Sequence, residues 1–129
     1  MDCFDVSASG LSAQRARLDV ITSNIANVET TRTPAGGPYR RLAAVFASRG
    51  SNPAGVEMIG TVADAREPRR VHQPGHPDAN AEGFVDYPNV NIVEEMVDIV
   101  SAVRGYEANA AAFNAAKTMA QHALDLGRA

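Results

Sequence analysis

The stretch that decides the fold runs from Tyr87 to Met119 and reads YPNVNIVEEMVDIVSAVRGYEANAAAFNAAKTM. Along it, and on to Leu124, mostly apolar residues recur at alternating spacings of four and three, the heptad period of a helix that packs on another helix. The predicted seam comprises Ile92, Met96, Ile99, Val103, Tyr106, Ala110, Phe113, Lys117, Ala120 and Leu124, of which only Lys117 is out of character. A helix from Ile92 to Leu124 would be roughly 50 Å long at 1.5 Å per residue. This is long for so small a chain, so the helix needs partners.

The start of this helix is marked by residues with defined roles. Pro88 disfavours an earlier helical turn, and Asn91 can cap the helix while Glu94 reaches back to the cap. Glu94, Glu95 and Asp98 would lie near the positive end of the helix dipole. We therefore expect these carboxylates to stabilise the helix start and not to act as catalytic acids or bases.

The N-terminal third predicts a second helix of the same period, from Phe4 to Val28. Its seam comprises Phe4, Ser7, Leu11, Gln14, Leu18, Ile21, Ile25 and Val28. The part from Ser7 to Gly10 is a weak helix former, because Gly costs about 1 kcal/mol relative to Ala. We expect this end to fray unless another element packs on it.

The middle of the chain has a different character, since it contains every proline except Pro88. Residues 39–46 and 56–62 read as strands, and a third strand is possible around Phe84. The predicted fold is mainly α, with long N- and C-terminal helices paired as an antiparallel coiled coil and a small irregular β-containing insert between them. The predicted segments are 1–30, 31–86 and 87–129.

Composition limits the partners. Aromatic residues make up 5% of the chain and Trp is absent, so part of the burial must come from other molecules. A net charge of -3 gives no basic surface for nucleic acid or anionic lipid. No apolar run approaches the ~20 residues that span a bilayer, and no cleavable secretion signal is visible, so we expect no direct membrane insertion. The single cysteine, Cys3, allows no internal disulfide.

Candidate sites of chemistry are few. His72 and His76 are four residues apart and Asp78 follows, a spacing that on a helix could hold a metal ion, but Pro74 and Gly75 between them exclude a helix. The pair Gly36 and Gly37 precedes an expected strand and not a helix N-terminus, so it is not a phosphate cradle. The serines near the N-terminus form no nucleophile elbow. We expect no catalytic, cofactor-binding or metal-binding residue.

Several motifs resemble those of bacterial flagellar rod and hook proteins. Residues 7–15 (SASGLSAQR) and 23–28 (SNIANV) are similar to the N-terminal signature of that family. Proximal rod members resemble this chain further at residues 33–39, 74–79, 83–85, 87–91, 94–98 and 104–109. Two departures are Gly105, where such proteins more often carry Ala, and Phe84, where Tyr is usual.

The resemblance implies a structural subunit and not an enzyme. Such proteins pair their terminal helices around a central export channel, with the middle segment facing outward. It implies a place in the periplasmic rod of the flagellar basal body, reached through the flagellar type III export apparatus without a cleavable signal. The implied partners are copies of the chain, other proximal rod subunits, the ring-anchoring adaptor and the membrane ring protein.

Two alternatives remain open at this point. One is a cytosolic helical-hairpin binding module, and the other is a small metal-dependent protein that uses the loop of His72, His76 and Asp78. For the structural subunit, the hypothesised assembly seam comprises Leu11, Leu18, Ile21, Ile25, Val28, Ile92, Met96, Ile99, Val103, Tyr106, Phe113 and Leu124.

Overall fold

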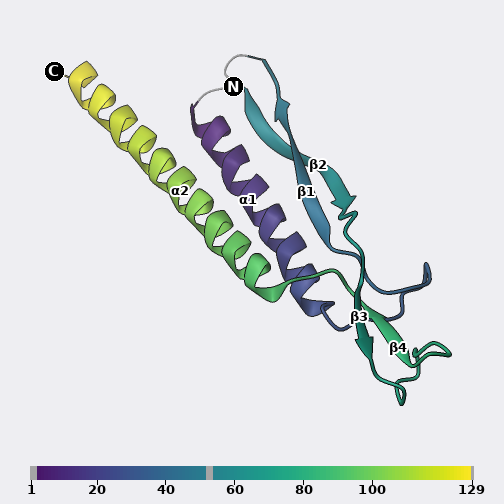
Figure 1. The fold of residues 1–129 in the computed structure, drawn as a ribbon. Coiled ribbons are helices and arrows are strands. Elements are labelled where there is room, and N and C mark those ends of the chain that lie inside the picture. The colour runs from purple at the N-terminus through teal and green to yellow at the C-terminus, as the bar shows by residue number, and fades with distance from the viewer. Residues whose placement is uncertain (1–2, 52–53, 129) are drawn as a thin grey trace. The chain divides into compact units, whose positions relative to one another are not determined.

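The computed structural model describes residues 3–51 and 54–128. In chain order the elements are α1 (Cys3–Ala26), β1 (Leu42–Arg49), β2 (Gly55–Ala63), β3 (Arg69–His72), β4 (Phe84–Tyr87) and α2 (Ile92–Arg128) (Figure 1). The helices have 24 and 37 residues, so roughly half of the chain is helical. The predicted class, two long helices flanking a small β-containing insert, is confirmed at this level.

The two predicted strands and the possible third around Phe84 are confirmed with small shifts, and one strand was missed. The predicted strand 39–46 is observed as β1, from Leu42 to Arg49, and it pairs with β2 in a two-stranded sheet. It begins later because the amides before it are bound elsewhere: that of Tyr39 donates to the Thr30 carbonyl, and that of Arg41 to the Asn89 side chain. The missed strand, β3, pairs antiparallel with β4, from Arg69 opposite Tyr87 to His72 opposite Phe84.

The chain divides into two compact units, each built from separate stretches. Unit 1 comprises residues 1–18, 44–60 and 100–129, and unit 2 comprises residues 19–43 and 61–99. Each unit draws on the N-terminal, middle and C-terminal parts of the chain. The division into segments 1–30, 31–86 and 87–129 therefore stays a prediction.

In unit 1, α1 packs on α2 and on β2. The rings of Phe4 and Phe113 meet edge to face with centroids 5.2 Å apart, and Gly10 lies against Asn109. Because contacts further along α1 fall earlier along α2, the two helices run antiparallel in this unit. The weak helix-forming part from Ser7 to Gly10 is helical and largely buried, so the condition for an ordered N-terminus is met.

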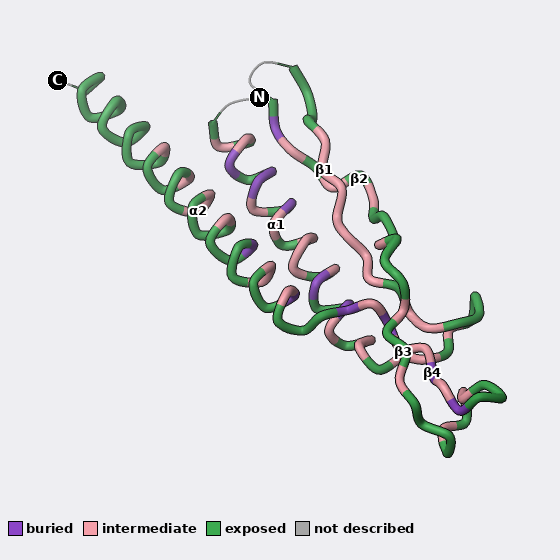
Figure 2. The backbone as a smooth tube through the Cα atoms, in the orientation of Figure 1, coloured by how far each residue is buried: buried purple, intermediate pink, exposed green. Residues whose placement is uncertain are grey.

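In unit 2, the enclosed residues come from the end of α1, the β3–β4 region and the first turns of α2 (Figure 2). Ile21, Val85 and Val90 are its buried apolar residues. Asn24 and Glu95 are also buried, with 1% and 0% of their surfaces exposed. A core of this kind must satisfy the polar groups inside it.

The predicted start of α2 is confirmed, with one correction. The Asn91 side-chain Oδ1 accepts hydrogen bonds from the amides of Val93 at 2.9 Å and Glu94 at 3.3 Å, as an N-cap does. The Glu94 carboxylate was expected to return a bond to the cap. It is held instead by Arg66, whose Nη1 and Nη2 donate to it at 3.1 and 3.2 Å.

Candidate assembly site and buried charge cluster

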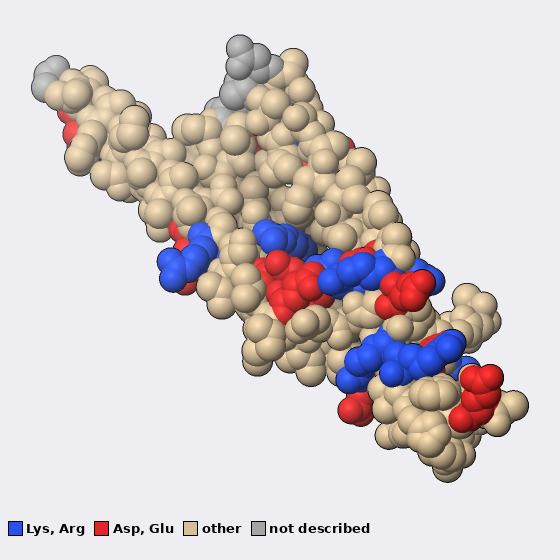
Figure 3. Space-filling view, in the orientation of Figure 1, with Lys and Arg blue, Asp and Glu red and all other residues tan. Residues whose placement is uncertain are grey.

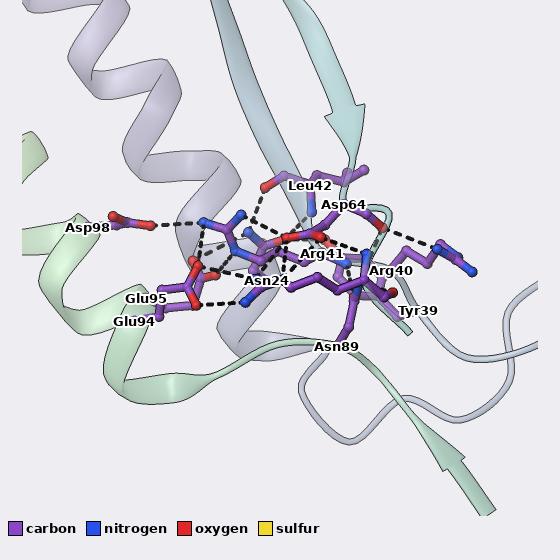
Figure 4. A network of polar contacts seen from close by, with 11 residues as sticks. Asn24, Tyr39, Arg40, Arg41, Leu42, Asp64, Asn89, Glu94, Glu95 and Asp98 are labelled. Carbon is purple, nitrogen blue, oxygen red and sulfur yellow. Dashed lines mark hydrogen bonds and ion pairs between the residues drawn. The ribbon is translucent and has the colours of Figure 1, made fainter. Parts of the chain in front are cut away.

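The most enclosed group of charges lies in unit 2 around Arg41, the residue before β1 (Figure 4). Its Nε donates to Glu95 Oε1 at 2.5 Å, its Nη2 to Asp98 Oδ2 at 2.9 Å, and its Nη1 lies 3.4 Å from Asp64 Oδ2. Only 15% of the Arg41 side chain and none of the Glu95 side chain is exposed. One guanidinium thus joins the first turns of α2 to the segment that follows β2.

The charge of Arg41 is maintained by these neighbours. Burial alone would lower the pKa of the guanidinium, but the hydrogen bond and negative charge of Glu95, with the charges of Glu94 and Asp98, raise its pKa above the ordinary value. The group therefore stays a fixed cation.

Asn24 joins the end of α1 to this cluster. Its Nδ2 donates to the Leu42 carbonyl at 2.8 Å and lies 3.4 Å from Glu95 Oε2. Its Oδ1 accepts from the Leu42 amide at 3.0 Å and from the Tyr39 hydroxyl at 2.8 Å. The side chain therefore pairs with both backbone groups of one residue at the start of β1, as a neighbouring strand would. This pairing fixes the helix end relative to the strand.

Asp64 and Arg66 extend the cluster toward the surface. The Asp64 amide donates to the Arg41 carbonyl at 2.8 Å, and Arg66 Nη2 donates to Asp64 Oδ2 at 2.8 Å. Side-chain and backbone hydrogen bonds from Arg66 hold the Asp64 pKa at about 2, below its ordinary value of 3.8. The Glu94 carboxylate completes this outer pair by accepting from Arg66.

Asn89 satisfies the backbone around the cluster. Its Oδ1 accepts from the Arg41 amide at 2.8 Å, and its Nδ2 donates to the carbonyls of Asp64 at 3.2 Å and Arg66 at 2.9 Å. The side chain thus bonds to the segment before β1 and to the segment after β2.

Each carboxylate at the start of α2 is paired with an arginine. Glu95 and Asp98 are bound by Arg41, and Glu94 is bound by Arg66. The helix-dipole account given from the sequence is therefore incomplete, because Glu95 is wholly buried and acts as the counterion of Arg41. On the face drawn in Figure 3, acidic and basic side chains likewise lie next to one another.

The structure separates the residues of the hypothesised assembly seam by exposure. Ile21 is buried, and Leu11, Leu18, Ile25, Val28, Ile99 and Phe113 are half-buried. The other five, all on α2, are exposed: Ile92 by 44%, Met96 by 58%, Val103 by 39%, Tyr106 by 42% and Leu124 by 66%. The single chain therefore buries only part of these positions, and their role as an assembly seam stays a prediction.

The inward face of α2 keeps the predicted period with a different set of residues. Glu95 and Ala102 are fully buried, whereas Met96 and Val103, one position later, are exposed. Ala116 is half-buried where the out-of-character Lys117 is exposed. The inward positions thus alternate small or polar residues with Ile99 and Phe113. Small residues on this face allow a close approach of α1.

The loop of His72, His76 and Asp78 has its side chains engaged in other contacts in unit 2. Asp78 accepts a hydrogen bond from the Thr31 hydroxyl at 2.6 Å and is also bound by Arg32. The Asp78 amide donates to Nδ1 of His76 at 3.0 Å. The His72 ring meets Phe84 edge to face at 5.0 Å. These contacts tie the loop to the segment after α1.

Within residues 3–51 and 54–128, no group of three or more His, Cys, Asp or Glu side chains is arranged to hold a metal ion. In the same part of the chain, neither helix combines the length and the apolar character needed to cross a bilayer.

The charge cluster was missed by reasoning from sequence, although a signal was present. Glu95, Ala102 and Asn109 recur every seven residues, one position before Met96, Val103 and Ala110. Because Met96 and Val103 are the larger apolar residues, an apolar pattern alone indicates the second set. The sign that the first set faces inward was Lys117: the second set continues to this charged residue, whereas the first set continues to Ala116.

Comparison with known proteins identifies the family. Residues 4–32 match the family model described as flagella basal body rod protein, and residues 81–126 match the one described as flagellar basal body rod FlgEFG protein C-terminal. The flagellar basal-body rod protein FlgC of Borreliella burgdorferi is 44% identical, over 94% of this chain and 93% of that protein. FlgC of Bacillus subtilis is 41% identical over 97% and 96%, and FlgC of Escherichia coli O6:H1 is 39% identical over 99% and 98%, respectively. The chain belongs to the FlgC family of flagellar basal-body rod proteins.

Proposed function

We propose that this chain, a structural subunit of the flagellar basal-body rod, is held in the rod by apolar residues of α2 that pack on neighbouring subunits. The observation that carries the proposal is the exposure of these residues. In unit 2, α2 exposes Val93 by 69%, Met96 by 58% and Val97 by 63%; in unit 1 it exposes Val100 by 53% and Tyr106 by 42%. Large apolar side chains grouped in this way on a soluble surface mark an interaction site.

Two sets of exposed residues favour a contact with more than one neighbour. Val93, Val97 and Val100 are spaced by four and three, and Met96 and Val103, seven residues apart, lie beside them. One partner helix covers one such stripe. We therefore infer a heterologous contact, in which one surface of a subunit meets a different surface of the next and the array stays open.

The inferred neighbours follow from the family and from the motif resemblance. They are copies of the chain, other proximal rod subunits, the ring-anchoring adaptor and the membrane ring protein. We place the subunit in the periplasmic, proximal part of the rod, and we infer that it travels through the flagellar type III export apparatus without a cleavable signal. Within the rod, α1 and α2 would form an antiparallel coiled coil that borders the channel.

The subunit works without catalytic activity in this proposal. The carboxylates that could serve as acid or base are bound by Arg41 and Arg66, and the loop histidines are engaged by Phe84 and the Asp78 amide. Neither the metal-dependent alternative nor a cytosolic binding module is favoured by these contacts or by the family.

The test is carried out in a motile bacterium and places a charge at Val97, in the exposed stripe of Val93, Val97 and Val100. Burying a Val side chain contributes about 1.5 to 3 kcal/mol, and burying an unpaired charge in its place is costly. Because Val97 is 63% exposed in the single chain, Val97→Asp should leave the folded subunit intact. We expect a chain that is produced but builds no complete rod, and a loss of swimming.

Two matched variants serve as controls. Val97→Ile keeps the apolar surface, and Ser101→Asp adds the same charge at an exposed polar position of α2. Both should swim. Normal swimming and full recovery of rods with Val97→Asp would refute the proposal.

A further inference from the structure

Two glycines of unit 1, Gly10 and Gly105, lie at close contacts between α1 and α2. A Cβ atom added at Gly10 would lie 2.4 Å from Asn109 Oδ1 and 2.7 Å from Asn109 Cγ. A Cβ added at Gly105 would lie 2.9 Å from Gln14 Nε2 and 3.0 Å from Gln14 Cδ. Each helix therefore offers a glycine to an amide side chain of the other, and the two contacts are one helical turn apart.

The surrounding bonds hold this arrangement in place. Asn109 Nδ2 donates to the carbonyl of Gly105 at 2.9 Å, which orients the amide that meets Gly10. Beside Gly10, the Ser9 hydroxyl donates to the Val6 carbonyl at 2.7 Å and accepts from the Val56 amide of β2 at 3.1 Å. Adjacent residues of α1 thus contact β2 and α2.

We propose that Gly10 with Asn109 and Gly105 with Gln14 form a reciprocal lock that sets the register of α1 on α2 in unit 1. A slide by one turn would move Asn109 from Gly10 to the position of Val6 or Gln14, where a side chain fills the space that the glycine leaves open. The lock explains why Gly10, a poor helix former, lies inside α1: the contact of Gly10 with Asn109 offsets the low helix propensity of glycine. It holds independently of how the subunit packs in the rod.

The proposal predicts that a glycine-to-alanine substitution at Gly10 lowers the stability of the chain, whereas the same substitution inside a helix usually raises it. Replacing a helical glycine by alanine stabilises a helix by about 1 kcal/mol when the new methyl group has space. At Gly10 the methyl group would collide with Oδ1 and Cγ of Asn109, and Cγ is close to the backbone and has little freedom to move. In α2, Gly127 is the matched control, because a Cβ there meets nothing within 4 Å.

The experiment measures the Tm of the purified full chain by circular dichroism. We expect Gly10→Ala to lower the Tm by about 5 °C or more, a typical shift for a loss near 1 kcal/mol in a small domain. Gly127→Ala should leave the Tm unchanged or raise it. Gly105→Ala should have a smaller effect than Gly10→Ala, because the end of the Gln14 side chain can move away.

A double variant tests the partner. Asn109→Ala should restore much of the Tm lost in Gly10→Ala, although in the unaltered chain it should not raise the Tm. If Gly10→Ala does not fold, the double variant must fold. An unchanged or raised Tm for Gly10→Ala would overturn the lock, and so would a loss that Asn109→Ala does not relieve.

Discussion

At the scale of single residues, the feature that matters most is the pair of Arg41 and Glu95 in unit 2. A buried ion pair gains little over a well-packed apolar pair, because both ions lose their hydration. The pair matters here because its hydrogen bonds are directional. The Arg41 guanidinium binds Glu95, Asp98 and Asp64 together, and Asn24 also binds the Glu95 carboxylate. Few other arrangements of these segments would satisfy all of these groups at once.

Removing the cation should therefore cost more than removing a surface charge. Arg41→Ala leaves Glu95, with none of its side chain exposed, beside only the amide of Asn24. We expect a loss of about 3 to 5 kcal/mol in the free energy of unfolding, measured by urea titration. Arg66→Ala is the control, since 51% of that side chain is exposed, and it should lower the free energy of unfolding much less than Arg41→Ala. Equal losses for both variants would contradict the central position given to Arg41.

The sequence predicted Glu95 as a carboxylate that stabilises the helix start, and not as a buried partner of Arg41, for a physical reason. A carboxylate in the first turn of a helix is explained by the dipole alone, and a carboxylate is seldom buried. Only the position of a distant arginine turns the same residue into a buried counterion. Asn24 likewise bonds to both backbone groups of Leu42, a contact between residues 18 positions apart that no local sequence pattern indicates.

At the scale of elements, the sequence predicted the helices well and their faces less well. Proline, the Asn91 cap and the heptad period were sufficient to place the start of α2 at Ile92. The period says how often a face recurs, whereas the identity of that face depends on what lies opposite. Here small and polar residues such as Ala102 and Asn109 face inward, and larger apolar ones such as Met96 stay exposed.

The missed strand shows the same limit. Residues 69–72 (RRVH) carry no apolar alternation, so no local pattern predicts a strand there. They become β3 through their antiparallel pairing with β4, in which Val71 lies opposite Val85. Pairing of this kind depends on contacts distant in sequence and is not a local property.

The cap of α2 can be tested by a single substitution. Asn91→Ala removes the acceptor for the amides of Val93 and Glu94, and we expect it to lower the free energy of unfolding by about 1 kcal/mol. Asn114→Ala is the matched control, because it replaces an exposed asparagine in the middle of the same helix. That change should be neutral or stabilising, since Ala is the better helix former. A cap variant as stable as the original chain would refute the assignment.

At the scale of the whole molecule, the chain buries little apolar surface for its length. Among the described residues, the buried hydrophobic core consists of Ala13, Ile21, Val85, Val90 and Ala102, with Pro88 also buried. Many of its larger apolar side chains are instead exposed on α2. We propose that the subunit gains much of its stability when neighbours in the rod cover these side chains.

The most direct measurement compares the exposure of one such residue in the free chain and in the assembled rod. The Cys3→Ser substitution first removes the exposed native thiol. In that variant, Val97→Cys places a single reactive thiol in the exposed apolar stripe of Val93, Val97 and Val100. Its labelling by a water-soluble maleimide would be quantified by mass spectrometry on the purified chain and on isolated basal bodies. The account predicts rapid labelling of the free chain and strong protection in the basal body. Equal labelling in the two states, or absence of the chain from basal bodies of a swimming strain, would contradict it.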